Sequence, residues 1–228
     1  MNGPPCDCAE PHAVHRIVLT GGPGAGKTAV LELVRKHFCR HVRVLPEAAS
    51  MLFGGGFPRS ELPTSKKAAQ RAIFHVQREL ENLADHEPLP GHLPGGPGTQ
   101  LPALILCDRG TLDGVAYWPG SPDEMLTEVD TTIERELSRY AAVIHLRTPT
   151  AQLGYNHSNA LRTEPAAIAA EIDRRIADAW RDHPRRFVVD SRADFLRKAT
   201  EALDILRDEM PICCRGRRAP GITGSAVP

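Results

Sequence analysis

The chain has 228 residues, and its 28 Lys plus Arg balance its 28 Asp plus Glu, which gives a formal net charge of zero at pH 7. This length suits one sizeable α/β domain with its own core. The charge balance provides no overall field that would attract nucleic acid or an anionic membrane, so we expect no nucleic-acid partner and any anion site to be local.

The six cysteines do not show the spacing of a zinc framework. Cys6 and Cys8 form CxC, and Cys213 and Cys214 are adjacent, whereas structural zinc sites usually combine CxxC pairs with further Cys or His. We therefore expect reduced thiols and a cytoplasmic setting. The sequence has neither a secretion signal nor a run of about 18 apolar residues, so it predicts no transmembrane segment.

Two segments contain the tetrapeptide GGPG, and their flanks distinguish them. The copy in HRIVLTGGPGAGKTAVLELV (15–34) follows the apolar run 17–19, which is typical of a buried parallel strand, and precedes apolar residues at helical spacing. The copy at 93–102 lies in the Pro/Gly-rich loop 87–102, where prolines oppose regular structure. Only the first copy is expected to bind phosphate.

The first copy also fits the Walker A pattern GxxxxGK(S/T) through Gly21, Gly26, Lys27 and Thr28. The glycines allow successive backbone amides to face one anion, Lys27 is expected to reach the outer phosphates, and the Thr28 hydroxyl suits Mg²⁺. The predicted nucleotide-binding residues are Gly21, Gly22, Pro23, Gly24, Ala25, Gly26, Lys27, Thr28 and Ala29.

The rest of the chain alternates strands and helices. After the first helix the pattern predicts a strand over 42–45 and a long amphipathic helix over 63–84, capped by Thr64 or Ser65. Beyond the Pro/Gly loop follow a strand at 103–107, a helix carrying Leu126, Val129, Ile133 and Leu137, and a strand at 141–146. A polar stretch, a helix, a strand at 186–190 and a final helix from about 195 to 206 complete the pattern.

This alternation predicts an α/β domain with a parallel sheet of about five strands and its site at their carboxyl ends. The domain is expected to span 15–210, with a lid at 147–165. The aperiodic segments 1–14 and 211–228 are predicted to be disordered tails.

Two carboxylates are expected at the edge that carries the phosphate loop. Asp108 ends an apolar strand and is predicted to hold Mg²⁺, with a helix-capping role as the alternative. Glu47 follows the second strand and either accepts the proton of an acceptor hydroxyl or forms a structural salt bridge with Arg109. Arg109 itself either contacts the transferred phosphate or holds Glu47.

Several arginines lie in or after the polar stretch: Arg147, Arg162, Arg174 and Arg175. A closing lid could deliver one guanidinium to the γ-phosphate of the nucleotide. Arg162 is predicted for this role, and a solvated loop arginine is the alternative.

The motifs GGPGAGKT, LPEAA, CDRG followed by TLDGVAYW, LRTE through AWRDHP, and DFLRK resemble a known family. It is that of the AAA-type P-loop ATP/GTP-binding proteins related to the nicotinamide riboside kinase domain and the TRPL translocation defect proteins. The likeness covers about 15–210 and implies a kinase-like, three-layer P-loop NTPase fold in which the Asp108 strand neighbours the phosphate-loop strand. It also implies nucleotide and metal at Lys27 and Thr28, metal near Asp108 and a lid carrying Arg162.

Two functions stay open from the sequence. The first is an Mg²⁺-dependent phosphotransferase that uses ATP, or GTP, on an unidentified small-molecule acceptor. The second is a nucleotide-dependent switch or trafficking factor that binds GTP and a protein or phosphoinositide partner. Ser158, Asn159 and Ala160 stand where some relatives carry an acidic residue before the lid arginine, so the resemblance does not extend to acceptor or metal contacts from that segment.

Overall fold

The computed structural model describes residues 12–89, 101–149, 166–191 and 194–215. Its centre is one five-stranded sheet in which every neighbouring pair of strands is parallel, in the order β2-β3-β1-β4-β5. The strands are β1 (His15–Thr20), β2 (Val42–Leu45), β3 (Leu104–Asp108), β4 (Ala142–Leu146) and β5 (Arg186–Val189). The predicted parallel sheet of about five strands is confirmed.

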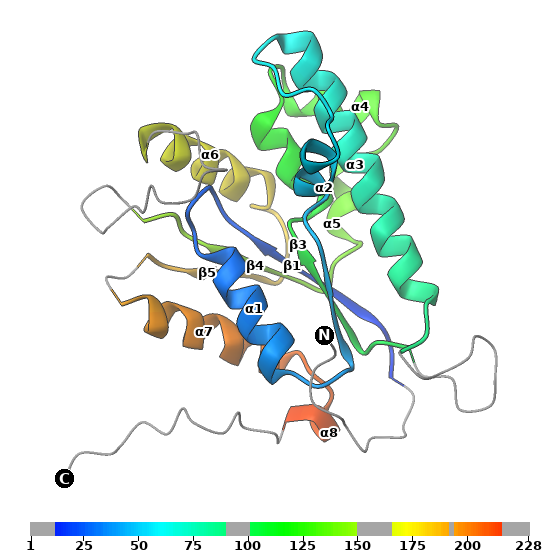
Figure 1. The fold of residues 1–228 in the computed structure, drawn as a ribbon, viewed down its shortest axis with the longest axis vertical. Helices are drawn as coiled ribbons and strands as arrows, with labels where there is room; N and C mark the ends of the chain where they lie inside the picture. The colour runs from blue at the N-terminus through cyan, green and yellow to red at the C-terminus, as the bar shows by residue number, and fades with distance from the viewer. Residues whose placement is uncertain (1–11, 90–100, 150–165, 192–193, 216–228) are drawn as a thin grey trace.

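Helices cover both faces of the sheet, giving three layers (Figure 1). On one face lie α1 (Lys27–His37), α7 (Phe195–Asp208) and the short α8 (Ile212–Arg215). On the other face lie α3 (Pro63–His86), the 3₁₀ helix η1 (Thr111–Tyr117), α4 (Pro122–Glu128), α5 (Ile133–Leu137) and α6 (Ala166–Ala179). The short α2 (Ala48–Gly54) follows β2 and packs against α3.

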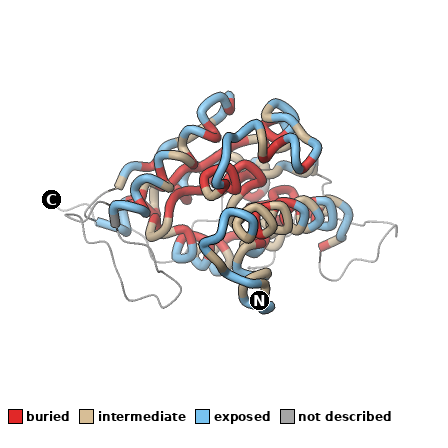
Figure 2. Tube along the Cα trace, turned by 90° about the horizontal axis from the view of Figure 1, so that it is seen from above, coloured by how far each residue is buried: buried red, intermediate tan, exposed pale blue. Residues whose placement is uncertain are grey.

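The strands separate two hydrophobic cores because alternate side chains point to opposite faces. In β1, Ile17 and Leu19 belong to the core shared with α1 and α7, whereas Val18 belongs to the core shared with α3 and α6. All three side chains are buried, as expected for a parallel sheet covered on both sides. Figure 2 shows the buried residues concentrated along the sheet and the inner helix faces.

The register of the central strands decides which residues share an edge. Leu19 of β1 is aligned with Asp108 of β3, and Thr20 is aligned with His145 of β4. The phosphate loop therefore leaves β1 directly beside the last residue of β3. The predicted proximity of the Asp108 strand and the phosphate-loop strand is confirmed.

Two local predictions need correction. The apolar pattern over 126–137 predicts one helix, but Asp130 has a left-handed φ of 52° and separates α4 from α5. The first turn of α5 is capped by the Thr132 hydroxyl. Secondary structure also continues past residue 210, because α8 lies inside the segment predicted as a tail. The 3₁₀ helix η1 and the short α2 have no clear apolar periodicity and were not predicted.

Side-chain hydrogen bonds fix η1, which directly follows the CDRG motif. The Tyr140 hydroxyl accepts the backbone N–H of Thr111 at 3.0 Å and donates to Glu81 of α3 at 2.8 Å. The Thr111 hydroxyl donates to Glu136 of α5 at 2.7 Å. Because Glu81 and Glu136 are fully buried, these bonds satisfy groups that would be costly to leave unpaired. The segment after Asp108 is thus held rigidly.

Gly110 allows α6 to approach this segment closely. A Cβ at this position would lie 2.7 Å from the Trp180 ring and 2.8 Å from the Val18 side chain, both of them fully buried. We predict that Gly110→Ala lowers the free energy of unfolding by about 1–3 kcal/mol through overpacking, measured by urea denaturation. Gly54→Ala is the matched control, since a Cβ there meets nothing within 4 Å and the variant should be neutral. Equal stability of the two variants would contradict this account.

Candidate functional site

The phosphate loop runs from the end of β1 to the start of α1 and depends on glycine backbone geometry. Gly21 and Gly26 have φ values of 137° and 95°, which residues with a Cβ rarely adopt. A Cβ on Gly21 would also lie 2.1 Å from the Leu146 carbonyl oxygen. Thr28 and Ala29 are exposed in the first turn of α1, where free amides and the helix dipole favour an anion.

Lys27 is folded back along this loop. Its ammonium group is buried and donates to the carbonyl oxygens of Gly21 at 2.8 Å and Gly22 at 3.3 Å. Burial, reinforced by the nearby Arg109 guanidinium, lowers the pKa of Lys27 to about 8. The ammonium is therefore held at an energetic cost that an added anion would relieve.

Asp108, at the end of β3, is an acidic group whose pKa is raised, whereas Lys27 is a basic group whose pKa is lowered. Burial is the largest influence on this carboxyl group and raises its pKa to about 6. Its Oδ1 is buried and has no hydrogen-bond partner among the described residues. Asp108 is aligned with Leu19, at the end of the strand that leads into the phosphate loop, and Thr28 is exposed at the other end of that loop. A carboxylate oxygen without a partner and a hydroxyl oxygen are both the hard donors that Mg²⁺ prefers. The residues present therefore fit a magnesium ion.

Glu47 and Arg109 form an ion pair across the site. The Arg109 Nε donates to Glu47 Oε1 at 2.5 Å, and the Ser50 hydroxyl also donates to this carboxylate. Burial opposes ionisation of Glu47, but Arg109, Ser50 and Lys27 together outweigh it and lower the pKa of Glu47 to about 2. Of the alternatives left open by the sequence, the salt bridge is the one formed between the described side chains.

Arg109 reaches the loop from a strained backbone position. Its φ of 74° is left-handed, which is uncommon for a residue with a long side chain. The guanidinium lies 5.7 Å from the centre of the Tyr117 ring and donates to the Gly21 carbonyl oxygen at 3.2 Å. Strain of this kind persists only where the surroundings enforce it, and here Glu47, Gly21 and Tyr117 do so.

Asp113 was missed by the sequence reading and connects the two sides of the site. Its carboxylate accepts hydrogen bonds from the Thr20 hydroxyl at 2.7 Å, the Trp180 indole at 2.7 Å and Arg109 at 3.1 Å. It is buried in η1, five residues after Asp108. Its only signal in the sequence is an acidic residue in the stretch TLDG, where a buried 3₁₀ helix was not foreseen.

Asp173 of α6 was also missed, and it anchors the start of the phosphate loop. It accepts the Gly22 N–H at 2.8 Å and contacts the His145 ring at 3.0 Å. Burial opposes its ionisation, but His145, the Gly22 amide and Arg147 together lower the pKa of Asp173 to about 2. On the sequence Asp173 is one of several charged residues in an amphipathic helix, so periodicity alone could not distinguish it.

Lys198 of α7 was likewise missed and supports the loop from the other helix layer. Its ammonium donates to the Ala25 carbonyl oxygen at 2.8 Å, and burial lowers its pKa to about 8. The ring of Phe195 lies directly over Gly26, since a Cβ on that glycine would come within 2.6 Å of it. The start of α7 therefore covers one side of the phosphate loop.

Of the arginines in or after the polar stretch, the structure describes Arg147, Arg174 and Arg175. Arg162 lies outside the described residues. Arg174 is exposed and pairs with Glu171 and Asp178 on its own helix, and Arg175 donates to backbone carbonyls of the η1 segment. Those two arginines are therefore engaged structurally. Arg147 reaches Asp173 at 3.4 Å.

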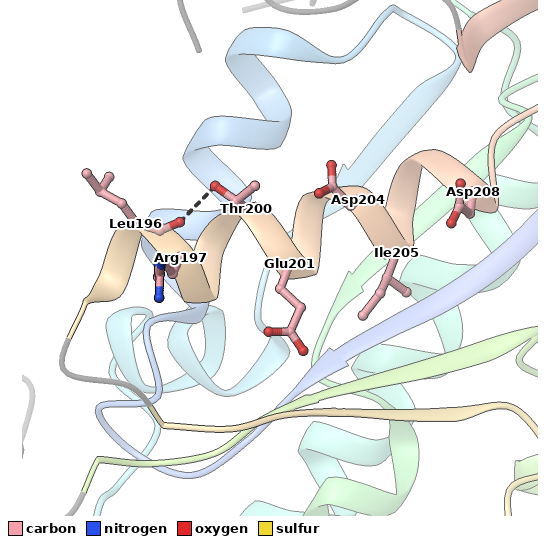
Figure 3. Close-up of a pocket in the computed structure, with 7 residues that line it drawn as sticks. All are labelled: Leu196, Arg197, Thr200, Glu201, Asp204, Ile205 and Asp208. Carbon is pink, nitrogen blue, oxygen red and sulfur yellow. Dashed lines mark hydrogen bonds between the residues drawn. The ribbon is translucent and has the colours of Figure 1, made fainter. Parts of the chain in front are cut away.

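A shallow hollow along the outer face of α7 contains none of the predicted site residues. It is lined by Leu196, Arg197, Thr200, Glu201, Asp204, Ile205 and Asp208 (Figure 3). All of these side chains come from one helix, and Figure 3 shows them spread along it rather than converging on a point. The chemistry instead gathers at the carboxyl edge of the sheet. In the described part of the chain, no helix is both long and apolar enough to cross a membrane.

Comparisons with known proteins agree with this architecture. Two solved structures of the NadR protein, one in complex with NAD and AMP-PNP and one in complex with NR, resemble the chain with TM-scores of 0.57 and 0.58. Sequence identity is 13% and 14%, so this similarity concerns the fold alone. Each alignment covers 92% of this chain but only 52% or 54% of NadR, so the chain spans about half of the NadR length.

A search among curated proteins found no match. A family model described as an AAA domain, in contrast, matches residues 16–198. That range runs from β1 to α7 and includes the phosphate loop and all five strands. The chain therefore has a kinase-like P-loop NTPase fold and belongs to this AAA domain family.

Proposed function

We propose that the chain is an Mg²⁺-dependent phosphotransferase that moves the γ-phosphoryl group of ATP to a hydroxyl group of a small metabolite. The observation that carries this proposal is the meeting of Lys27 and Asp108 at one edge of the sheet. The first is a buried cation, and the second is a half-buried carboxylate whose buried Oδ1 has no hydrogen-bond partner among the described residues. A magnesium triphosphate supplies the anion that Lys27 needs and the cation that Asp108 needs.

In this proposal the loop from Gly21 to Ala29 surrounds the phosphates with its amides, and the Lys27 ammonium exchanges its carbonyl partners for phosphate oxygens. Thr28 and Asp108 would hold Mg²⁺, which neutralises charge on the phosphates when it is bound. The neighbouring NadR structure contains AMP-PNP, an ATP analogue, and this favours ATP over GTP.

Transfer forms a bond between the acceptor oxygen and the γ-phosphorus, breaks the bond to the β–γ bridging oxygen and releases ADP. Glu47 is the carboxylate that receives the hydrogen bond of the acceptor hydroxyl. With a pKa of about 2 it cannot retain the proton, which passes to solvent. Arg109 holds Glu47 in position, and Arg162 is proposed to bring its guanidinium to the γ-phosphate when the 147–165 segment closes.

One contact favours a second candidate, a nucleotide-dependent switch with a protein or phosphoinositide partner. Asp173 joins the Gly22 amide to α6, the helix that follows the 147–165 segment. A nucleotide that rearranges the loop would therefore act on α6 directly, and a partner could recognise the result. This candidate requires tight nucleotide binding with slow hydrolysis and no dependence on an acceptor.

An acceptor screen separates the two candidates. Purified protein with Mg·ATP is mixed with nucleosides, nicotinamide riboside or phosphoinositide headgroups, and ADP release is measured. We expect one nucleoside-like compound to raise the rate at least about tenfold over ATP alone. A panel without any stimulation, together with micromolar nucleotide affinity, would reject the phosphotransferase and support the switch.

Asp108→Asn should remove Mg²⁺-dependent turnover while the protein still binds ATP, because the amide keeps the shape but not the charge of the carboxylate. We expect a loss of at least about 100-fold in the turnover number, with a change in ATP affinity of less than about fivefold. Asp123→Asn, at an exposed position of α4, is the control. Full activity of Asp108→Asn would show that the Asp108 carboxylate is not needed for turnover and would contradict its proposed role.

ATP affinity should fall as the pH rises through about 8. The pKa of Lys27 is depressed in the free protein, so the ammonium is present below pH 8 and lost above it, whereas phosphate binding favours the charged form. The expected decrease approaches tenfold per pH unit between pH 8 and 10, measured by calorimetric titration. Because the pKa of Lys27 is lower in the folded than in the unfolded chain, burying its charge costs folding free energy below pH 8. This cost disappears as the pH rises, so the folded protein becomes more stable over the same range. Weaker ATP binding above pH 8 is therefore not caused by unfolding.

Lys198 needs a control of its own, because its pKa is also about 8 and it touches the loop at Ala25. Lys198→Gln should keep the decrease in ATP affinity above pH 8. Lys27→Arg, whose guanidinium stays charged, should flatten the profile, and Lys27→Met should weaken binding at every pH. A profile that vanishes in Lys198→Gln but survives in the Lys27 variants would assign the titration to Lys198.

A further inference from the structure

Three potential metal ligands meet at the edge of the sheet opposite the phosphate loop. They are Cys39, His41 and Cys214, and one ligand atom from each lies within 4.8 Å of the other two. Cys39 and His41 lie between α1 and β2, whereas Cys214 belongs to α8, 173 residues after His41 along the chain. All three residues are buried, with exposed fractions of 5%, 0% and 9%.

The separations match those between ligands of one tetrahedral metal ion. The Nδ1 atom of His41 lies 3.7 Å from the Cys39 sulfur and 3.5 Å from the Cys214 sulfur. A thiolate at about 2.3 Å and an imidazole nitrogen at about 2.0 Å from Zn²⁺, at a tetrahedral angle, lie about 3.5 Å apart. Both observed distances, 3.7 and 3.5 Å, agree with this value within about 0.2 Å.

Backbone hydrogen bonds hold the ligands in place. The Val42 N–H donates to the Cys39 carbonyl at 3.0 Å and closes the turn that brings Cys39 and His41 to the same side. The His41 carbonyl accepts the N–H groups of Ala103 and Leu104, at the start of β3. On α8, the Cys214 N–H donates to the Pro211 carbonyl at 2.8 Å. The arrangement therefore does not depend on flexible side chains alone.

The ligand chemistry selects a class of metal. Two sulfurs and one imidazole nitrogen suit Zn²⁺ and similar thiophilic ions, and they are poor ligands for Mg²⁺ or Ca²⁺. The His12 ring lies edge-on to the His41 ring, with centroids 5.5 Å apart, so a second imidazole borders the cluster.

We propose that Cys39, His41 and Cys214 form a structural zinc site that attaches α8 to the start of β2. Cys39 and Cys214 belong to the same hydrophobic core as Phe38, Leu206 and Met210, beneath α1 and α7, and His41 directly precedes β2. Its contribution is to the stability of this end of the domain, because metal bound only by the folded chain adds its binding free energy to folding. It is separate from the proposed magnesium site and does not rest on the proposed function.

The first test measures metal in the full-length chain, purified without a histidine tag and under reducing conditions. Elemental analysis should find about one zinc per chain. Replacement with Co²⁺ should produce the absorption bands of a tetrahedral cobalt–thiolate centre. Removing the metal with a chelator should lower the melting temperature by roughly 5 °C or more, and added Zn²⁺ should restore it.

Variants assign the ligands. Cys39→Ser, His41→Gln and Cys214→Ser should each reduce the bound zinc by at least about tenfold and change or abolish the cobalt bands. Cys107→Ser is the matched control, since Cys107 is an equally buried thiol on β3 outside the cluster, and it should keep one zinc per chain.

The wild-type measurements decide the matter even if a variant fails to fold. A chain without zinc that also shows no cobalt–thiolate bands overturns the proposal. A Cys39–Cys214 disulfide found by mass spectrometry in the reduced preparation, or a control variant that loses zinc to the same extent, overturns it as well.

Discussion

The pairing of β1 with β3 is the constraint on which the site depends. Their register places Leu19 opposite Asp108, so the phosphate loop and a half-buried carboxylate emerge side by side although 80 or more residues separate them. Neither the loop nor the aspartate would by itself indicate a nucleotide site, because glycine-rich turns and aspartates at strand ends are both common in proteins. The packing of Gly110 against Trp180 and Val18 keeps the chain after Asp108 in the same place.

Desolvation then gives these residues their chemical character. Arg109 and Glu47 satisfy each other, so the pKa of Glu47 is low and its charge is stable. The Lys27 ammonium is hydrogen-bonded only to neutral carbonyl oxygens, and the Oδ1 of Asp108 has no hydrogen-bond partner among the described residues. Burial lowers the pKa of Lys27 and raises the pKa of Asp108, so in both cases it favours the neutral form. A ligand that carries both an anion and a cation is complementary to this pair. That complementarity, rather than the fold, distinguishes a nucleotide site from a structural salt-bridge network.

The sequence was informative where a property is local. The strands follow from apolar runs, and the loop residues Gly21, Gly26, Lys27 and Thr28 follow from a motif whose spacing is set by backbone geometry. Asp113 and Asp173 were not predicted because their roles arise from tertiary contacts with Thr20, Trp180 and Gly22. The break between α4 and α5 was missed for a related reason, since apolar periodicity continues across Asp130 while the backbone does not.

The same reasoning explains why the cysteine spacing was uninformative. A zinc framework read from the sequence requires ligands in neighbouring pairs, but Cys39 and Cys214 meet only because α1 and α7 run side by side and end at the same edge of the sheet. That edge carries none of the residues assigned to phosphate chemistry. A stabilising metal there can strengthen the domain without contacting Arg109 or the phosphate loop, which lie at the other edge of the sheet. The two edges of one sheet can thus divide stability and chemistry between them.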